Sequence, residues 1–120
     1  MLTFDLVTID AERPDQLAMF WCEALGLGVV EREDGDRWQV LGDDSGRRRI
    51  GIQRGRHRRG GVHLDLECAT AEFDAVVARL VALGATRTCD DRVEPYGAIA
   101  NLADPEGNLF DVCAYVTDPT

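Results

Sequence analysis

Two stretches of the chain repeat apolar residues with the period of an α-helix. The first carries its apolar residues at Leu17, Phe20, Trp21, Ala24 and Leu25. Spacings of three and four residues place such side chains on one face of a helix. Pro14 and Asp15 come just before this pattern and are typical of a helix start. The pattern therefore predicts a helix over residues 14–25.

The second helical pattern lies in the other half of the chain. Its apolar positions are Phe73, Val76, Val77 and Leu80. Thr70 is a plausible N-cap, so the pattern predicts a helix over residues 70–83. Both patterns stop at a Leu-Gly pair, at Gly26 and at Gly84. Glycine fits the left-handed conformation that commonly closes a helix.

The two halves of the chain resemble each other. Gly26 and Gly84 lie 58 residues apart, about half of the 120-residue chain, which suggests a duplicated unit. Short β-like runs flank each helix in the same order. The predicted strands are 3–9, 28–33, 37–41 and 49–53 in the first half, and 62–68, 86–89, 97–103 and 109–115 in the second. We therefore predict one domain of two βαβββ units, about 1–53 and about 62–116, joined by a linker at 54–61.

Strand alternation places several polar groups away from the helices. Successive side chains of a strand point to opposite faces. One face of 62–68 carries His63, Asp65 and Glu67, and one face of 109–115 carries Leu109, Asp111, Cys113 and Tyr115. Subtracting the 58-residue repeat relates His63 to Asp5 and Asp111 to Gln53. We therefore predict that these four positions share one central site, although exposed strand faces are commonly polar without one.

Composition narrows the class of protein. The net charge of −9 argues against general nucleic-acid binding. No apolar run approaches the roughly 18 residues that span a membrane. The first ten residues lack the basic and apolar pattern of a secretory signal, so we expect a cytoplasmic protein with no membrane partner. The four cysteines are scattered and read as free thiols.

All thirteen basic residues are arginines. The absence of lysine excludes Schiff-base chemistry and a phosphate-binding lysine. Seven of the arginines lie between positions 47 and 59. This cluster is either a solvated surface or a pocket for an anionic substrate, and the sequence leaves both open.

Four motifs in the chain resemble those of a known superfamily. They are AMFWCEALGLGVV (18–30), VHLDLEC (62–68), VARLVALGA (77–85) and LADPEGNLFDV (102–112). Together they are similar to the vicinal oxygen chelate superfamily, which contains glyoxalase I, bleomycin-resistance proteins and extradiol dioxygenases. The resemblance implies an α+β fold, in which two βαβββ units form a curved eight-stranded mixed sheet around a cavity.

The resemblance also implies a metal site. Metal-dependent members of the superfamily draw their ligands from the first and last strands of each unit. In this sequence those positions are near Asp5, Gln53, His63 and Asp111. This set departs from the usual histidines and glutamates of the superfamily, and its imidazole and carboxylates suit Mn²⁺, Fe²⁺, Ni²⁺ or Mg²⁺.

Two functions follow as expectations. The first is a metal-assisted isomerase, epimerase or lyase that acts on a small oxygenated molecule by stabilising an enolate, with His63 and Asp111 as catalytic residues. The second is a binding protein that sequesters an antibiotic or metabolite, as bleomycin-resistance proteins do. The candidate substrate-binding residues are Trp38, Tyr96, Cys113 and Tyr115. Exposed sheet edges, and the pairing common in the superfamily, also predict a homodimer.

Overall fold

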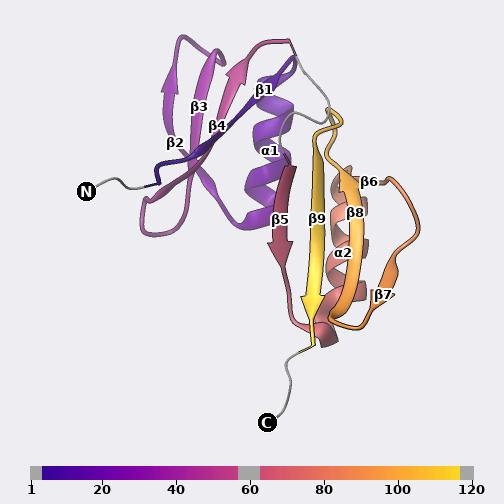
Figure 1. Cartoon of the computed structure of the whole chain (residues 1–120). Coiled ribbons are helices and arrows are strands. Elements are labelled where there is room, and N and C mark those ends of the chain that lie inside the picture. The colour runs from indigo at the N-terminus through magenta and orange to yellow at the C-terminus, as the bar shows by residue number, and fades with distance from the viewer. Residues whose placement is uncertain (1–3, 57–62, 117–120) are drawn as a thin grey trace. The chain divides into compact units, whose positions relative to one another are not determined.

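A computed structural model of the chain describes residues 4–56 and 63–116 (Figure 1). The chain forms two compact units that divide between Arg58 and Arg59. The greater part of the predicted linker, residues 57–61, lies outside the described residues, as do Val62, His57 and the two arginines at the division.

Unit 1 is a four-stranded sheet with a helix on one face (Figure 1). Its elements are β1 (Val7–Ala11), α1 (Pro14–Leu25), β2 (Gly28–Glu33), β3 (Trp38–Gly42) and β4 (Arg48–Arg54). The strand order is β1-β4-β3-β2. β1 and β4 run parallel, and the other neighbours are antiparallel.

Unit 2 repeats this plan with a divided edge strand. Its elements are β5 (His63–Glu67), the 3₁₀ turn η1 (Thr70–Glu72), α2 (Phe73–Leu83), β6 (Thr86–Arg87), β7 (Arg92–Glu94), β8 (Gly97–Ala103) and β9 (Leu109–Tyr115). The strand order is β5-β9-β8-β6, and β7 also pairs with β8. β5 and β9 are parallel. The strand predicted at 86–89 is confirmed only over Thr86–Arg87, and β7 is a further short strand on the same edge that the sequence did not predict.

The α+β class and the repeated unit predicted from the sequence are confirmed. The described residues form two mixed sheets, one of four strands in unit 1 and one of five strands in unit 2. In each unit the first and last strands lie next to each other and run parallel. The cavity enclosed by both units stays a prediction.

The first predicted strand is wrong in its bounds and in which alternate residues are buried. The sequence suggested a strand over 3–9 with Phe4 and Leu6 on its apolar face. In the structure β1 covers Val7–Ala11, with Ile9 and Ala11 buried, whereas Phe4 is 72% exposed. Leu6 and Val7 are adjacent apolar residues, so the pattern contains two alternation frames, and burial against α1 selects the later one.

Both helical patterns are confirmed by the buried faces. α1 buries Leu17, Phe20 and Trp21, and the two rings meet edge-to-face with centroids 5.0 Å apart. Gly26 closes α1 in the left-handed conformation, with φ of +66°. Thr70 is not a cap, because its hydroxyl donates a hydrogen bond to the backbone carbonyl of Tyr115 instead.

The hairpin loops of the two units share one construction. In unit 1 the Asp43 carboxylate accepts hydrogen bonds from the backbone and hydroxyl of Ser45 and from the backbone N–H of Arg47. In unit 2 the Asp104 carboxylate accepts them from the backbone of Glu106 and from the backbone and amide of Asn108. Each loop therefore joins its two antiparallel strands around one aspartate.

Replacing Asp43 with asparagine is expected to destabilise the protein at pH 7 but not near pH 2. Hydrogen bonds from the Ser45 hydroxyl and the Arg47 N–H lower the pKa of the Asp43 carboxyl from its ordinary value of 3.8 to about 2. A lowered folded-state pKa contributes stability above the unfolded-state value, and that stability is lost as the pH falls through about 2. Urea unfolding of both proteins at the two pH values tests this. A difference that does not change with pH would contradict it.

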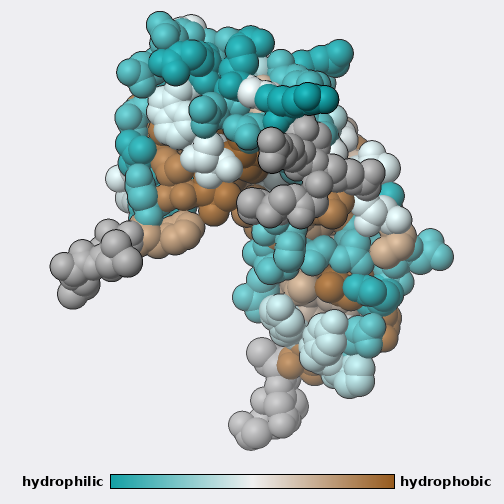
Figure 2. All heavy atoms as spheres, turned by 45° about the horizontal axis from the view of Figure 1, so that its top comes forward, coloured by the Kyte–Doolittle hydropathy of each residue, from teal (hydrophilic) through white to brown (hydrophobic). Residues whose placement is uncertain are grey.

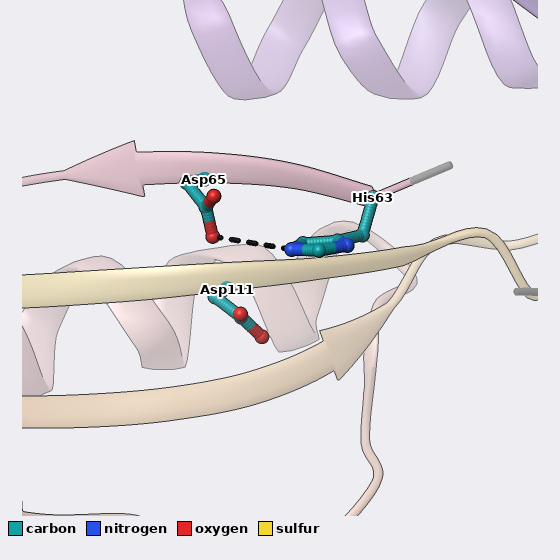
Figure 3. A group of neighbouring side chains, drawn as sticks. All are labelled: His63, Asp65 and Asp111. Carbon is teal, nitrogen blue, oxygen red and sulfur yellow. Dashed lines mark ion pairs between the residues drawn. The ribbon is translucent and has the colours of Figure 1, made fainter. Parts of the chain in front are cut away.

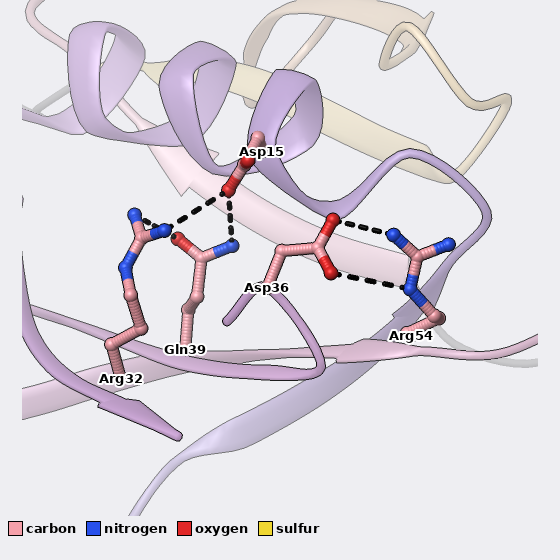
Figure 4. Close-up of polar contacts among 5 residues, drawn as sticks. All are labelled: Asp15, Arg32, Asp36, Gln39 and Arg54. Atoms are coloured by element: carbon pink, nitrogen blue, oxygen red, sulfur yellow. Dashed lines mark hydrogen bonds and ion pairs between the residues drawn. The ribbon is translucent and has the colours of Figure 1, made fainter. Parts of the chain in front are cut away.

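Arginines of the sequence cluster are largely occupied by acidic neighbours. Arg54 pairs with Asp36 through two hydrogen bonds, as Figure 4 shows. Arg49 pairs with Asp43, and Arg48 pairs with two carboxylates, those of Asp5 and Glu31. These contacts favour an ion-paired surface over an anion pocket for this part of the cluster.

A buried amide ties the start of α1 to its sheet (Figure 4). Gln39 is fully buried on β3 and donates a hydrogen bond to the Asp15 carboxylate at 3.0 Å. Its carbonyl oxygen accepts a hydrogen bond from Arg32 at 3.2 Å, and Arg32 also reaches Asp15. Buried polar groups are costly unless they are hydrogen-bonded, so this network is a specific constraint on how the helix lies on the sheet.

The visible surface is mainly hydrophilic, with smaller apolar areas between (Figure 2). The exposed large apolar residues of the described ranges include Phe4, Met19, Val93, Tyr96, Tyr115 and Val116. None of the described helices has the length and apolarity needed to cross a membrane. The homodimer and the cytoplasmic location stay predictions.

Candidate functional site

Three side chains with metal-binding atoms converge on one face of unit 2. His63, Asp65 and Asp111 each offer one ligand atom, and these atoms lie within 4.8 Å of one another. His63 and Asp65 extend from β5 and Asp111 extends from β9 (Figure 3). The Nε2 atom of His63 lies 3.6 Å from an Asp65 carboxylate oxygen.

Strand register explains why these residues meet. β5 and β9 are parallel neighbours, and Asp65 lies directly opposite Asp111. His63 is two positions before Asp65, so both side chains point to the same face. The alternate residues of β9, among them Phe110 and Val112, are buried and face the opposite way. Polar residues thus stay on the face away from α2, as strand alternation predicted for His63 and Asp111.

The cluster is open to solvent on the β5 side and more enclosed on the β9 side. The side chains of His63 and Asp65 are 58% and 67% exposed, and Asp111 is only partly exposed. The amide of Asn101, on β8, donates a hydrogen bond to the Asp111 carboxylate at 2.5 Å. Two carboxylates close together also make the face favourable for a cation.

The donor set fits a divalent metal ion. Metal–ligand bonds of about 2.1 Å place two ligands of one ion about 3 Å apart when adjacent and about 4 Å apart when opposite. The observed limit of 4.8 Å is a little wider. Because His63 and Asp65 are exposed, small side-chain rotations can close that difference. An imidazole with two carboxylates is a donor set for Mn²⁺, Fe²⁺, Ni²⁺ or Mg²⁺.

Three of the predicted substrate-binding residues lie on unit 2. Cys113 and Tyr115 follow Asp111 on the same face of β9, and Tyr115 lies about 13 Å along the strand from Asp111. The rings of Tyr96 and Tyr115 are 6.3 Å apart. A hydrogen bond with the Cys113 side chain raises the pKa of the Tyr115 hydroxyl. The face therefore has an acidic end and an aromatic end.

Unit 1 carries different residues at the corresponding positions. The loops clamped by Asp43 and Asp104 align β3 with β8 and β4 with β9. Asn101 and Val40 each lie three residues before the loop aspartate. The residues paired with them are Asp111 in unit 2 and Gly51 in unit 1, and the next strand places Asp65 opposite Asp111 and Thr8 opposite Gly51. Leu6 takes the place of His63. Unit 1 therefore has no counterpart of the imidazole or of either carboxylate at these described positions.

The fourth predicted substrate-binding residue, Trp38, occupies the space over Gly51. A Cβ atom added at Gly51 would lie 2.5 Å from the Trp38 ring and 2.9 Å from the Thr8 hydroxyl. A side chain at position 51 would therefore require the Trp38 ring or the Thr8 hydroxyl to move. The position that holds a carboxylate in unit 2 thus holds an aromatic ring in unit 1.

The 58-residue equivalences are corrected by this register. Asp5 precedes β1 and forms an ion pair with Arg48 at 3.1 Å, and Gln53 is exposed on β4 opposite Trp38. A register shift between β3 and β4 near Gly42 changes the spacing in unit 1, so one constant offset cannot align every strand. The participation of Asp5 and Gln53 in a metal site stays a prediction.

Sequence reasoning missed two members of the cluster. Asp65 was not among the predicted ligands, although alternation had already placed it on the face of His63. Asn101 lies in the apolar stretch GAIANLA, where a single amide gives no recognisable motif. Its role appears only when β8 is paired with β9 and Asn101 falls opposite Asp111.

Comparison with known proteins identifies the family. A family model described as glyoxalase-like domain matches residues 6–113. A glyoxalase/bleomycin resistance protein/dioxygenase family enzyme from Burkholderia phytofirmans has a TM-score of 0.78 and 21% identity, covering 93% of this chain and 98% of that one. A glyoxalase-related enzyme from Fulvimarina pelagi has a TM-score of 0.73 and 19% identity, covering 95% and 88%.

A further similar structure contains a metal. The fosfomycin resistance protein of Listeria monocytogenes, complexed with Mn(II) and sulfate, has a TM-score of 0.77 and 18% identity, covering 97% of this chain and 92% of that one. At these low sequence identities, the structural similarity establishes the shared fold alone. No curated protein matches the sequence significantly. The family model spans nearly the whole chain, and the chain therefore belongs to the glyoxalase-like domain family.

Proposed function

We propose that this protein is a divalent-metal-dependent enzyme that acts on a small oxygenated metabolite, as an isomerase, epimerase or lyase. The convergence of His63, Asp65 and Asp111 within 4.8 Å carries this proposal. These three residues would hold the ion. A bound divalent cation would supply Lewis-acid stabilisation of an oxyanion, such as an enolate.

The residues of the chain have separate tasks in this proposal. Asp65 lies 3.6 Å from the His63 ring nitrogen, so these two side chains would approach one ion together from β5. Asp111 is fixed by its hydrogen bond from Asn101. A histidine at such a site can serve as a ligand or as a base that accepts a proton from carbon next to a carbonyl. His63 and Asp111 are therefore the proposed catalytic residues.

Similarity to a Mn(II)-containing relative supports the metal. The fosfomycin resistance protein from Listeria shares this fold, and a mutant of it was solved with Mn(II) and 1S,2S-dihydroxypropylphosphonic acid, a small oxygenated molecule. The present chain offers an imidazole and carboxylates on its own sheet. The proposal for this chain is limited to the class of ion and the class of substrate.

A sequestering protein is the second candidate. The observation that favours it is the aromatic end of unit 2, where Tyr96 and Tyr115 lie 6.3 Å apart and are half-exposed. Unit 1 also has Leu6 and Gly51 at the positions that correspond to His63 and Asp111, and neither side chain can bind a metal ion. Such a protein would bind an antibiotic or metabolite between aromatic side chains without converting it.

Mn²⁺ titration of the purified protein tests the proposal. We expect one Mn²⁺ per chain in the wild type and loss of that binding in Asp111→Ala, because one of three ligands is removed. Thermal unfolding of both proteins without metal is the control for folding. Wild-type protein that binds no Mn²⁺, Ni²⁺, Fe²⁺ or Mg²⁺ would contradict the enzyme proposal.

A metabolite panel then separates the two candidates. A thermal shift that a compound produces only with Mn²⁺ present, and that Asp111→Ala removes, supports the enzyme. A shift that does not require metal, and that Tyr115→Ala removes, supports the sequestering protein.

A further inference from the structure

Asn101 is built into the candidate metal site from the neighbouring strand. It lies on β8 directly opposite Asp111, and its Nδ2 atom donates a hydrogen bond to Asp111 Oδ1 at 2.5 Å. In Figure 3 the Asp111 carboxylate points from β9 toward β8. Both side chains are only partly exposed.

The orientation of the Asn101 amide is itself fixed. Its carbonyl oxygen accepts a hydrogen bond from the Cys89 thiol at 3.3 Å. The backbone carbonyl of Asn101 accepts hydrogen bonds from the N–H and the hydroxyl of Thr88, at 2.9 Å and 3.2 Å, and these hold the backbone of β8 at this point. Turning the amide over would replace the donor that faces Asp111 with an acceptor, and the two oxygens would repel each other. The amide nitrogen therefore stays toward the carboxylate.

This hydrogen bond makes the two carboxylate oxygens of Asp111 different from each other. One oxygen is engaged by Asn101, and the other remains for a cation held with His63 and Asp65. A carboxylate with one oxygen engaged in this way favours binding a cation through the other oxygen. Small octahedral cations accept such ligands together with several waters, whereas Ca²⁺ takes more oxygens and often both oxygens of one carboxylate.

We propose that Asn101 is a positioning residue that holds Asp111 as a one-oxygen ligand and so favours Mn²⁺ over Ca²⁺ at this site. This inference rests on the proposed metal site. It adds the selectivity of the site and the residue that sets it. Loss of a residue that hydrogen-bonds to a metal ligand typically lowers the metal affinity about 10–100-fold.

The test compares Mn²⁺ and Ca²⁺ affinities of the wild type with those of two variants. Asn101→Leu has a similar volume and no donor, and Asn101→Asp has the same shape with an acceptor in place of the donor. We expect Mn²⁺ affinity to fall about 10–100-fold in Asn101→Leu, with a smaller change for Ca²⁺, so that the Mn²⁺-to-Ca²⁺ ratio falls about tenfold.

A matched control separates positioning from general damage. Cys89→Ser retains a donor to the Asn101 carbonyl, so the Mn²⁺-to-Ca²⁺ ratio of this variant should equal that of the wild type. The Mn²⁺ electron paramagnetic resonance spectrum should change in both Asn101 variants and not in Cys89→Ser. A fall in affinity that is equal for both ions would show a merely structural role and overturn the inference.

Failure of the inference and failure of the proposed function give different results. If the wild type binds Mn²⁺ and Asn101→Leu keeps the same affinity and selectivity, the positioning role is refuted and the metal site stands. If the wild type binds neither ion, the metal site is refuted and the role of Asn101 falls with it.

Discussion

Replacing His63 with alanine is expected to weaken Mn²⁺ binding by at least about 100-fold. Loss of a second-shell partner alone typically costs about 10–100-fold in affinity, and His63 offers a ligand atom directly. It is also the nitrogen donor of the cluster, so the two remaining carboxylates would bind Mn²⁺ with less preference over Ca²⁺ or Mg²⁺. Calorimetric titration with Mn²⁺ measures the change.

The folded state should tolerate this substitution. The His63 side chain is 58% exposed, and exposed substitutions usually change the free energy of unfolding by less than about 0.5 kcal/mol. Glu67→Ala is the matched control, because Glu67 is exposed on the same face of β5 and lies outside the cluster. Equal Mn²⁺ affinity in His63→Ala and the wild type would remove the imidazole from the metal site.

Replacing Asp104 with alanine is expected to lower the free energy of unfolding by about 2–4 kcal/mol. Asp104 is 3% exposed, and its carboxylate accepts hydrogen bonds from the backbone N–H groups of Glu106 and Asn108. Hydrogen bonds to a charged group contribute about 1.5–3 kcal/mol each, and buried donors left without a partner add a further cost. The loop also sets the pairing of β8 with β9, so the effect reaches the sheet that carries Asp111.

Urea unfolding at neutral pH measures this effect. Asp44→Ala is a suitable control, because Asp44 is exposed in the corresponding loop of unit 1 and its loss should change the free energy of unfolding by less than about 0.5 kcal/mol. Asp104→Asn keeps one acceptor oxygen and should fall between the wild type and Asp104→Ala. A loss below about 1 kcal/mol for Asp104→Ala would show that the loop does not depend on its aspartate.

The sequence predicted the elements whose patterns are long and unambiguous. α1 matches the predicted bounds because five apolar residues and a proline define it. The strand at 109–115 is also confirmed, and its alternate residues Phe110, Val112 and Ala114 are buried as the pattern predicted. Strand alternation then placed His63 and Asp111 on one face before any pairing was known.

The features that the sequence did not predict depend on pairing between strands. The frame of β1 was ambiguous because Leu6 and Val7 are adjacent. The register shift near Gly42 is a property of two strands together, and no pattern within either strand indicates it. Asn101 joins the site for the same reason, since its importance comes from the residue that faces it on β9.

The indole that covers Gly51 makes the two units hard to interchange in their chemical roles. An aspartate introduced there would place its Cβ atom 2.5 Å from the Trp38 ring, so the ring would have to move or be replaced as well. A second centre of this kind would therefore require coordinated substitutions on at least two strands. The two units share one framework, and at this strand position unit 1 holds an aromatic ring where unit 2 holds a carboxylate.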